Sequence, residues 1–180
     1  MSQPIMCGRP SPDEYSEYFG RYIERVPAGD VIEFLGAQLV EFESCFGALP
    51  EHAHHFSYGE GKWSVNQLLG HILDTEWIFT TRCLWFARGN SGPLPGMDQD
   101  EFVAGADFDS RSLSSLMSEF GHLRRGAIEL FESLDEGVLS RSGVASETRL
   151  TVRSIIYLIA GHADHHMEVL RERYLPQLPS

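Results

Sequence analysis

Residues 151–174 read TVRSIIYLIAGHADHHMEVLRERY, and this stretch decides the fold. Apolar side chains recur in it at helical spacing, and Thr151 is a residue type that caps helix N-termini. The pattern predicts a helix over 151–174 that Pro176 ends, because proline cannot continue a helix. Residues 154–159 have the strongest strand propensity, yet they lie inside this helical pattern. No segment alternates convincingly with a period of two, so we predict an all-α fold.

Two earlier segments have the same periodicity and recognisable ends. The first predicted helix covers 31–46, because Asp30 followed by Glu33 resembles a capping box. The second covers 64–89, where the Ser64 hydroxyl can cap the start and a glycine stops the helix. Both are long enough to be helices of a bundle.

A third segment between these and residues 151–174 completes the set. It starts near Ser110 or Ser112 and closes at Gly137. Four long helices with apolar faces predict a four-helix bundle. Before them, residues 12–25 carry four aromatic side chains at helical spacing, which predicts a short amphipathic helix packed across the bundle.

The connection between the second and third helices is unusually long. It runs from Arg88 to Asp109, whereas roughly two to eight residues usually join bundle helices. Such a length fits a crossover or a loop that covers a cleft, and the GPLPG run at 92–96 excludes helix there. The acidic residues that follow form either a second polar wall of a site or a solvated loop, and we favour the loop. These residues are Asp98, Asp100 and Glu101.

Composition indicates an ordinary globular protein. The chain has 180 residues, of which 42% are hydrophobic and 22% charged, so we expect one domain over 1–180. No apolar run is suited to crossing a bilayer, and Met1–Pro10 lacks the features of a secretory signal. We therefore expect a cytoplasmic protein without membrane contact.

The charge of the chain argues against a nucleic-acid partner. The formal net charge is −12 at pH 7, which would repel a phosphate backbone. Two basic pairs, Arg124 with Arg125 and Arg171 with Arg173, lie in helical segments that also carry glutamates. We interpret these pairs as solvated faces with local ion pairs.

Several nucleophile and nucleotide motifs are absent. Cys7, Cys45 and Cys83 are widely spaced and form no C-x-x-C motif, so we expect reduced thiols without a disulfide. Cys83 lies in an apolar helical segment where nothing favours a thiolate. The sequence also lacks G-x-S-x-G, H-E-x-x-H and a phosphate-binding glycine motif, which removes support for serine hydrolases, zincins and nucleotide-binding proteins.

Three histidines lie where buried helices normally carry aliphatic residues. His162 and His166 are four residues apart and share one helix face, and His71 interrupts an apolar run in another helix. If the two helices pack side by side, the imidazoles converge on one divalent metal and leave positions open for water or substrate. A hydrogen-bonded core without metal is the alternative, although burying three imidazoles costs on the order of several kcal/mol unless partners satisfy them.

Neighbouring polar residues are candidates to support such a site. His165 points about 100° away from His166, so we place it beside the site or at the surface. Asp74 and Glu76 are candidates to orient an imidazole or relay protons, because ligating histidines usually donate their other N–H to a carboxylate or carbonyl. Glu76 has two alternatives, an ion pair with Arg82 or a position on the opposite helix face.

The remaining histidines are interpreted as exposed. His52, His54 and His55 lie in what looks like a loop before Trp63, where no fixed scaffold arranges them for a metal. His122 lies next to a glycine and near Arg124 in the third helical segment, and we expect its side chain in solvent.

Four short segments carry a resemblance to a known family. They read KWSV at 62–65, LGHILDTE at 69–76, PGMDQD at 95–100 and AGHADHH at 160–166. Over roughly residues 30–175 the chain resembles the DinB/YfiT-like superfamily, and the three histidines are the most specific part of the match. The resemblance implies a four-helix bundle, often a homodimer, with an open site for nickel, zinc, iron or manganese held by His71, His162 and His166.

The resemblance does not select one activity. Some relatives are transferases or isomerases that use a low-molecular-weight thiol, and others are described as hydrolases. Because a bound cation lowers the pKa of a coordinated thiol or water, we expect a metal-dependent transferase that activates such a thiol toward a small electrophile. The alternatives are a metal-dependent hydrolase of a small ester or amide, and a non-catalytic metal-binding dimeric module. No catalytic side chain is identified from the sequence.

Overall fold

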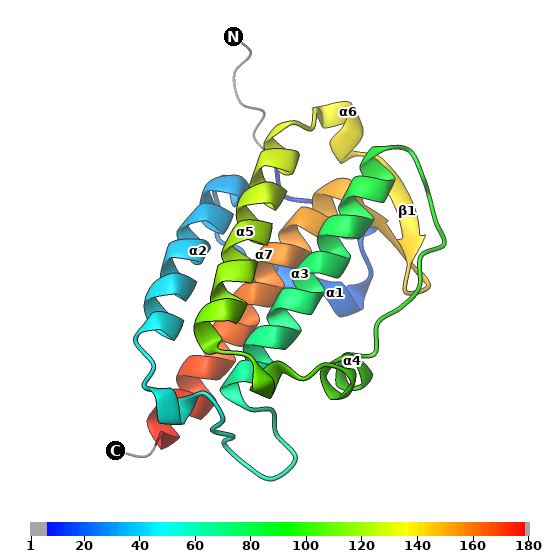
Figure 1. The fold of residues 1–180 in the computed structure, drawn as a ribbon. Helices are drawn as coiled ribbons and strands as arrows, with labels where there is room; N and C mark the ends of the chain where they lie inside the picture. Colours follow the sequence, from blue (N-terminus) through cyan, green and yellow to red (C-terminus); the bar gives the residue numbers. More distant parts are fainter. Residues whose placement is uncertain (1–6, 179–180) are drawn as a thin grey trace.

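Four long helices form the bundle in the computed structural model, which describes residues 7–178 (Figure 1). They are α2 (Val31–Gly47), α3 (Val65–Ala87), α5 (Leu113–Glu132) and α7 (Val152–Val169). Helices α2 and α3 each pack against both α5 and α7, so α2 and α3 lie on a diagonal of the bundle. The predicted all-α four-helix bundle is confirmed.

The polar residues predicted at the N-termini of the four long helices are found there as capping residues. Each long helix follows a residue whose side-chain oxygen accepts a backbone N–H of the first turn, which satisfies one of the free donors at a helix N-terminus. The four capping residues are Asp30, Ser64, Ser112 and Thr151. At Ser64 and Thr151 the bond is reciprocated from the third helical residue, so the starts of α3 and α7 are fixed most tightly.

The long connection between α3 and α5 is a crossover. In Figure 1, α3 and α5 run in the same direction, so the chain must return along the bundle between them. The returning segment contains the short helix α4 (Gln99–Gly105) and a 3-10 turn at Phe108–Ser110. The backbone of Leu94 also makes a parallel bridge to Ala145. The crossover therefore lies against the structure that precedes α7.

A small β-hairpin precedes α7 and was not expected from the sequence. Strands β1 (Ser142–Ala145) and β2 (Thr148–Thr151) pair antiparallel. Ser146 and Glu147 form the turn with φ values of 50° and 58°. This left-handed pair suits a tight hairpin, but the sequence offers no Asn-Gly or Asp-Gly signal for it.

Two predicted helix ends differ from the structure. Helix α5 ends at Glu132, and Gly137 does not close it but lies in a separate short helix, α6 (Glu136–Leu139), capped by Asp135. Beyond Val169, the chain continues as a π-helical turn over Leu170–Tyr174 and a 3-10 turn over Leu175–Gln177. The helix expected to end near Tyr174 therefore changes from α-helical to π-helical and then to 3-10 geometry over its last residues.

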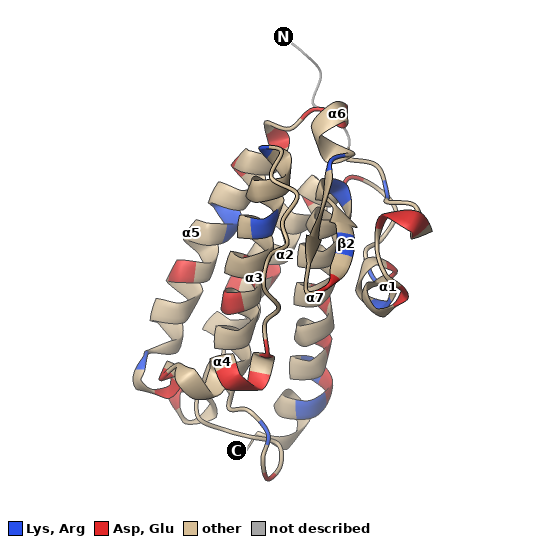
Figure 2. Cartoon of the chain, turned by 90° about the vertical axis from the view of Figure 1, so that its right-hand side faces the viewer, with Lys and Arg blue, Asp and Glu red and all other residues tan. Residues whose placement is uncertain are grey.

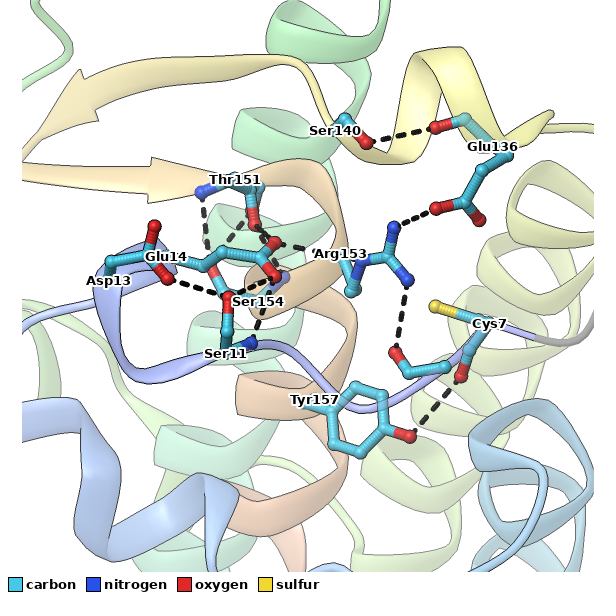
Figure 3. A network of polar contacts seen from close by, with 11 residues as sticks. Cys7, Ser11, Asp13, Glu14, Glu136, Ser140, Thr151, Arg153, Ser154 and Tyr157 are labelled. Carbon is cyan, nitrogen blue, oxygen red and sulfur yellow. Dashed lines mark hydrogen bonds and ion pairs between the residues drawn. The ribbon is translucent and has the colours of Figure 1, made fainter.

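The N-terminal segment is fastened to the first turns of α7. Figure 3 shows the polar network that holds it: the Thr151 hydroxyl donates to Glu14 Oε2 at 2.7 Å, and the Tyr157 hydroxyl donates to the carbonyl oxygen of Cys7 at 3.2 Å. Arg153 pairs with Glu136 of α6 and with Glu14 in the same network. The predicted short helix follows as α1 (Glu17–Ile23), which packs on α7.

Buried apolar side chains fill the bundle in two clusters, one around Phe86 and Ile155 and one around Phe42 and Leu69. Within residues 7–178, no helix combines the length and the apolar character that a membrane span requires.

One basic pair is placed differently from the prediction. Arg125 is exposed and pairs with Glu43, as a solvated face requires, but Arg124 is 0% exposed and pairs with Glu76 of α3. The interpretation of Arg124 as a surface residue is therefore wrong, because its side chain points into the bundle, where the buried Glu76 and Gln38 accept its hydrogen bonds.

Candidate metal centre

Helices α3 and α7 bring the three predicted histidines together. The cap at Ser64 fixes the start of α3 and so places His71 in its second turn, while His162 and His166 lie one turn apart on α7. The three Nε2 atoms are 3.1 Å apart in every pair. All three side chains are buried. Within residues 7–178, they are the one group of at least three potential ligands that could hold a metal ion.

Two glycines beside the histidines allow neighbouring segments to come close. A Cβ at Gly161 would lie 1.9 Å from the carbonyl oxygen of Tyr22, so α1 packs directly on α7 next to His162. A Cβ at Gly70 would lie 2.4 Å from the ring of Phe108, so the crossover packs directly on α3 next to His71. Both close approaches help to enclose the histidines.

Aromatic rings surround the cluster. The Trp63 ring centroid lies 4.7 Å from that of His71, and the Tyr22 centroid lies 5.5 Å from that of His162. Phe79 approaches His162 edge-on at 6.4 Å. These rings restrict the orientations that the imidazoles can take.

The nitrogen atoms fit a divalent metal better than a hydrogen-bonded core. A proton on one Nε2 atom serves one neighbour at a time, whereas three lone pairs directed to one point suit a cation about 2.0–2.1 Å from each nitrogen. Burial lowers the pKa of His71 to about 4 and the pKa values of His162 and His166 well below their ordinary value. The rings are therefore neutral at pH 7, which is the form that binds metal.

Two cavities meet at the histidines. One of about 390 Å³ borders His71 and His162, and another of about 380 Å³ borders His166. Gln99 and Asp100, in the first turn of α4, line both cavities. Helix α4 lies beside the lower part of α3, with acidic residues at its start (Figure 2). The cluster thus borders two cavities that share the first turn of α4 as a wall.

The acidic residues of the crossover differ from the favoured interpretation. They are exposed, as expected of a solvated loop, but they form the start of a helix that Asp98 caps by accepting the N–H groups of Asp100 and Glu101. Asp98 and Asp100 line the cavity that borders His71. The alternative of a second polar wall describes their position better.

The three accessory candidates do not hydrogen-bond to the imidazoles within residues 7–178. Glu76 has both carboxylate oxygens bound by Arg124, and not by Arg82. Asp74 is half-buried, and burial raises its pKa, with a further contribution from the charge of Glu119. His165 contacts the rings of Tyr22 and His166 at centroid distances of 5.6 Å and 4.9 Å. Among residues 7–178, Nδ1 of His166 has no hydrogen-bond partner although it is buried.

Two side chains of the cavity were missed from the sequence. Thr75 and Arg82 line the cavity beside His71. They follow His71 by four and eleven residues, which is the spacing of one helix face, so the periodicity of α3 contained the signal. Ser146, in the unpredicted hairpin turn, lines the same cavity.

The other histidines lie outside the cluster. His122 is exposed, as predicted, and so are His52 and His55, while His54 is partly buried. His55 approaches Asp109 at 3.3 Å. None of them joins the three buried imidazoles.

Comparisons with known proteins agree with this architecture. Residues 35–170 match the sequence profile of the DinB superfamily. The chain is 25% identical over 149 residues to "Putative metal-dependent hydrolase OB0413" of Oceanobacillus iheyensis, an alignment that covers 80% of this chain and 85% of that protein.

Two solved structures have similar folds. YfiT from Bacillus subtilis, described as a probable metal-dependent hydrolase with an unusual four-helix bundle topology, superposes with a TM-score of 0.69 at 17% identity. That match covers 91% of this chain and 92% of YfiT. A mycothiol-dependent maleylpyruvate isomerase superposes with a TM-score of 0.65 at 11% identity, over 81% of this chain and 61% of the isomerase. The match over residues 35–170 shows that the chain belongs to the DinB superfamily.

Proposed function

We propose that His71, His162 and His166 hold one divalent metal ion, and that the protein is a transferase that joins a low-molecular-weight thiol to a small electrophile. The observation that carries the proposal is the convergence of three Nε2 atoms where two cavities meet. A bound divalent cation lowers the pKa of a thiol or water and so supplies a nucleophile at neutral pH.

The chain's own thiols are unsuited to be the nucleophile. Burial raises the pKa of Cys7 and of Cys83 to about 12, and it also raises the pKa of Cys45. These groups stay protonated near pH 7, and a neutral thiol is a poor nucleophile. The nucleophile therefore comes from solution, either as a thiol cosubstrate or as water.

Two cavities at one cluster favour a reaction of two bound molecules. A transferase must bring a thiol and an electrophile together, and cavities of about 390 and 380 Å³ give each of them a place. The rings of Tyr22 and Phe79 form an apolar wall beside His162, which suits the carbon skeleton of a small molecule.

A metal-dependent hydrolase is the second candidate. The names of OB0413 and YfiT favour it, since both are described as metal-dependent hydrolases. In this case a small ester or amide occupies one cavity, and water replaces the thiol. The expected homodimer and cytoplasmic location stay predictions under either activity, as does a role of Asp74, Glu76 or His165 in orienting the histidines.

Elemental analysis tests the metal site. We would purify the chain without a histidine tag or a nickel column and measure metal content for the wild type, His71→Ala and His162→Ala. His122→Ala is the matched control, because His122 is an exposed imidazole outside the cluster. We expect one divalent ion per chain in the wild type and the control, and its loss in the other two variants. Unchanged metal content in those two would overturn the site.

The activity is tested next on the metal-loaded wild type. A panel of bacillithiol, mycothiol, glutathione and cysteine is offered with 1-chloro-2,4-dinitrobenzene, and p-nitrophenyl acetate is offered without thiol. Conjugation that requires a thiol supports the transferase. Ester hydrolysis without thiol, together with no conjugation, would replace it with the hydrolase.

A further inference from the structure

Arg82 is a buried cation without an acidic partner among residues 7–178. The residue is 5% exposed, and its Nη2 atom donates to the carbonyl oxygen of Pro95 at 2.7 Å and to Ser146 Oγ at 2.9 Å. Within those residues, no acceptor binds its Nε and Nη1 groups, neither group is closed to solvent, and no carboxylate lies within 4 Å. Its guanidinium lies over the Phe79 ring, 5.5 Å from the centroid.

Arg124, which is also buried, differs from Arg82 because its charge is paired. Arg124 has both oxygens of Glu76 and the side chain of Gln38 as acceptors. A buried charge without a partner is strongly unfavourable, because the interior does not replace its hydration. Arg82 keeps its proton in spite of burial, since guanidinium is always charged in proteins. A guanidinium that faces a cavity without a carboxylate partner is therefore available to bind an anion there.

The unpaired guanidinium lies at the cavity that contains the candidate metal ligands. Arg82 lines the same cavity as His71 and His162. Thr75 lies between His71 and Arg82 on the same face of α3, is 4% exposed, and has a hydroxyl without a hydrogen-bond partner in the described chain. The cavity thus has a cation on the α3 face that also carries His71, with the buried Thr75 hydroxyl between them.

The two carboxylates of the cavity do not neutralise Arg82. Asp98 and Asp100 line the same cavity at the start of α4, and neither lies within the 4 Å of an ion pair with Arg82. The Asp98 carboxylate is already bound by two backbone N–H groups at the start of α4. These aspartates would repel an anion placed near α4, so they direct its negative end toward Arg82.

We propose that Arg82 binds the carboxylate of an elongated small molecule whose other end reaches the three histidines. The Arg82 guanidinium lies 5.5 Å from the Phe79 ring centroid, and that centroid lies 6.4 Å from the His162 ring, so the two ends of the site are separated by about one aromatic ring and its contacts. The ligand therefore has several bonds between its carboxylate and its reacting atom. The assignment of a reacting end rests on the proposed function, but the carboxylate site does not require the metal. Either the electrophile or the thiol supplies the carboxylate.

Calorimetry with two pairs of probes tests the site. Adipate is compared with adipamide to represent an electrophile, and 6-mercaptohexanoate is compared with 6-mercaptohexanol to represent a thiol. Each probe is titrated into zinc-loaded and metal-free protein. The variants are Arg82→Met, which removes the charge, and Arg82→Lys, which keeps it. Arg88→Met is the matched control, because Arg88 is an exposed arginine just after α3 and outside the cavity.

We expect at least one carboxylate to bind the wild type better than its neutral counterpart. Its affinity should fall about tenfold to a hundredfold in Arg82→Met, the range for a lost hydrogen bond to a charged group. Arg82→Lys and Arg88→Met should stay within about threefold, and circular dichroism should show that all variants are folded. The pair that responds identifies the source of the carboxylate.

Two results would overturn the proposal: no preference for either carboxylate in the wild type, or the same preference in Arg82→Met. These failures differ from failure of the proposed function. If carboxylate binding does not depend on Arg82, the metal content and the thiol conjugation are still as proposed. If the protein holds no metal or has no conjugation activity, Arg82-dependent binding still appears in the metal-free titrations.

Discussion

Glu76 of α3 and Arg124 of α5 form an ion pair that is closed to solvent. Arg124 Nε and Nη2 donate to the two carboxylate oxygens at 2.5 Å and 2.7 Å, and the two residues are 0% and 3% exposed. Arg124 also donates to Gln38 Oε1, and the Gln38 amide donates to the carbonyl oxygen of Ala160, two residues before His162. The pair therefore connects three helices to the backbone beside the candidate metal site.

Removing one member of this pair should be costly. Arg124→Met leaves the Glu76 carboxylate buried without its cation, and we expect a loss of about 3–5 kcal/mol in the free energy of unfolding. Adding Glu76→Gln should restore part of that loss, because the remaining charge is removed. Urea denaturation of the single and double variants measures both effects.

The exposed pair Glu43 with Arg125 is the matched control. It has an N–O distance of 2.7 Å on neighbouring surfaces of α2 and α5. Arg125→Met should cost about 0–1 kcal/mol, since exposed ion pairs gain little over solvation. Equal costs for Arg124→Met and Arg125→Met would contradict the contribution assigned to burial.

Metal binding should raise the thermal stability of the folded chain. A ligand that binds only the native state stabilises it by about 2.7 kcal/mol at a free concentration of 100 times its Kd. For a chain of this size that corresponds to a rise in Tm of about 5–11 °C. Differential scanning fluorimetry of metal-free protein with added zinc or nickel measures the shift. It should appear in the wild type and His122→Ala and vanish in His166→Ala; a rise in His166→Ala would point to adventitious binding elsewhere.

The close contact of Gly161 with Tyr22 should tolerate no side chain. A Cβ would meet a backbone oxygen at 1.9 Å, and a backbone atom cannot swing away as a flexible side chain does. Gly161→Ala should therefore displace α1 and cost about 1–3 kcal/mol in unfolding free energy, with weaker metal binding because Tyr22 packs on His162.

Gly126 on α5 gives the opposite expectation for the same substitution. No atom lies within 4 Å of a Cβ built there. Gly126→Ala should stabilise the protein by about 0.5–1 kcal/mol, because alanine favours a helix interior. Guanidinium denaturation of both variants compares the two sites. Similar effects at Gly161 and Gly126 would show that α1 is not held against α7 as described.

The helices and the three histidines follow from local rules, which explains why the sequence predicted them. A cap at Ser64 and a spacing of four between His162 and His166 are properties of single helices. The three histidines come together only because α3 and α7 are neighbours in the bundle, which single-helix rules do not determine.

Features that depend on distant partners were beyond such rules. Arg124 lies beside an exposed arginine in the sequence, and its partner Glu76 is 48 residues away. The hairpin turn uses Ser146 and Glu147 at positive φ, where the usual signal is Asn or Gly. The acidic start of α4 reads as a solvated loop because its composition gives no sign of the cavity it lines.

The buried thiols give a prediction that depends on pH. Burial raises the pKa of Cys83 and of Cys7 from 9.0 to about 12, so the folded chain keeps these protons at pH values where the unfolded chain has lost them. The stability they contribute is complete below pH 9.0 and is lost as the pH rises toward about 12. At pH 8, Ellman's reagent should react with the partly buried Cys45 and reach the other two only in denaturant. Mass spectrometry of alkylated peptides identifies the sites, and Cys45→Ser is the control that should abolish the native reaction. Rapid labelling of Cys83 in the native chain would mean that a protein thiolate is available, and the case for an external nucleophile would fail with it.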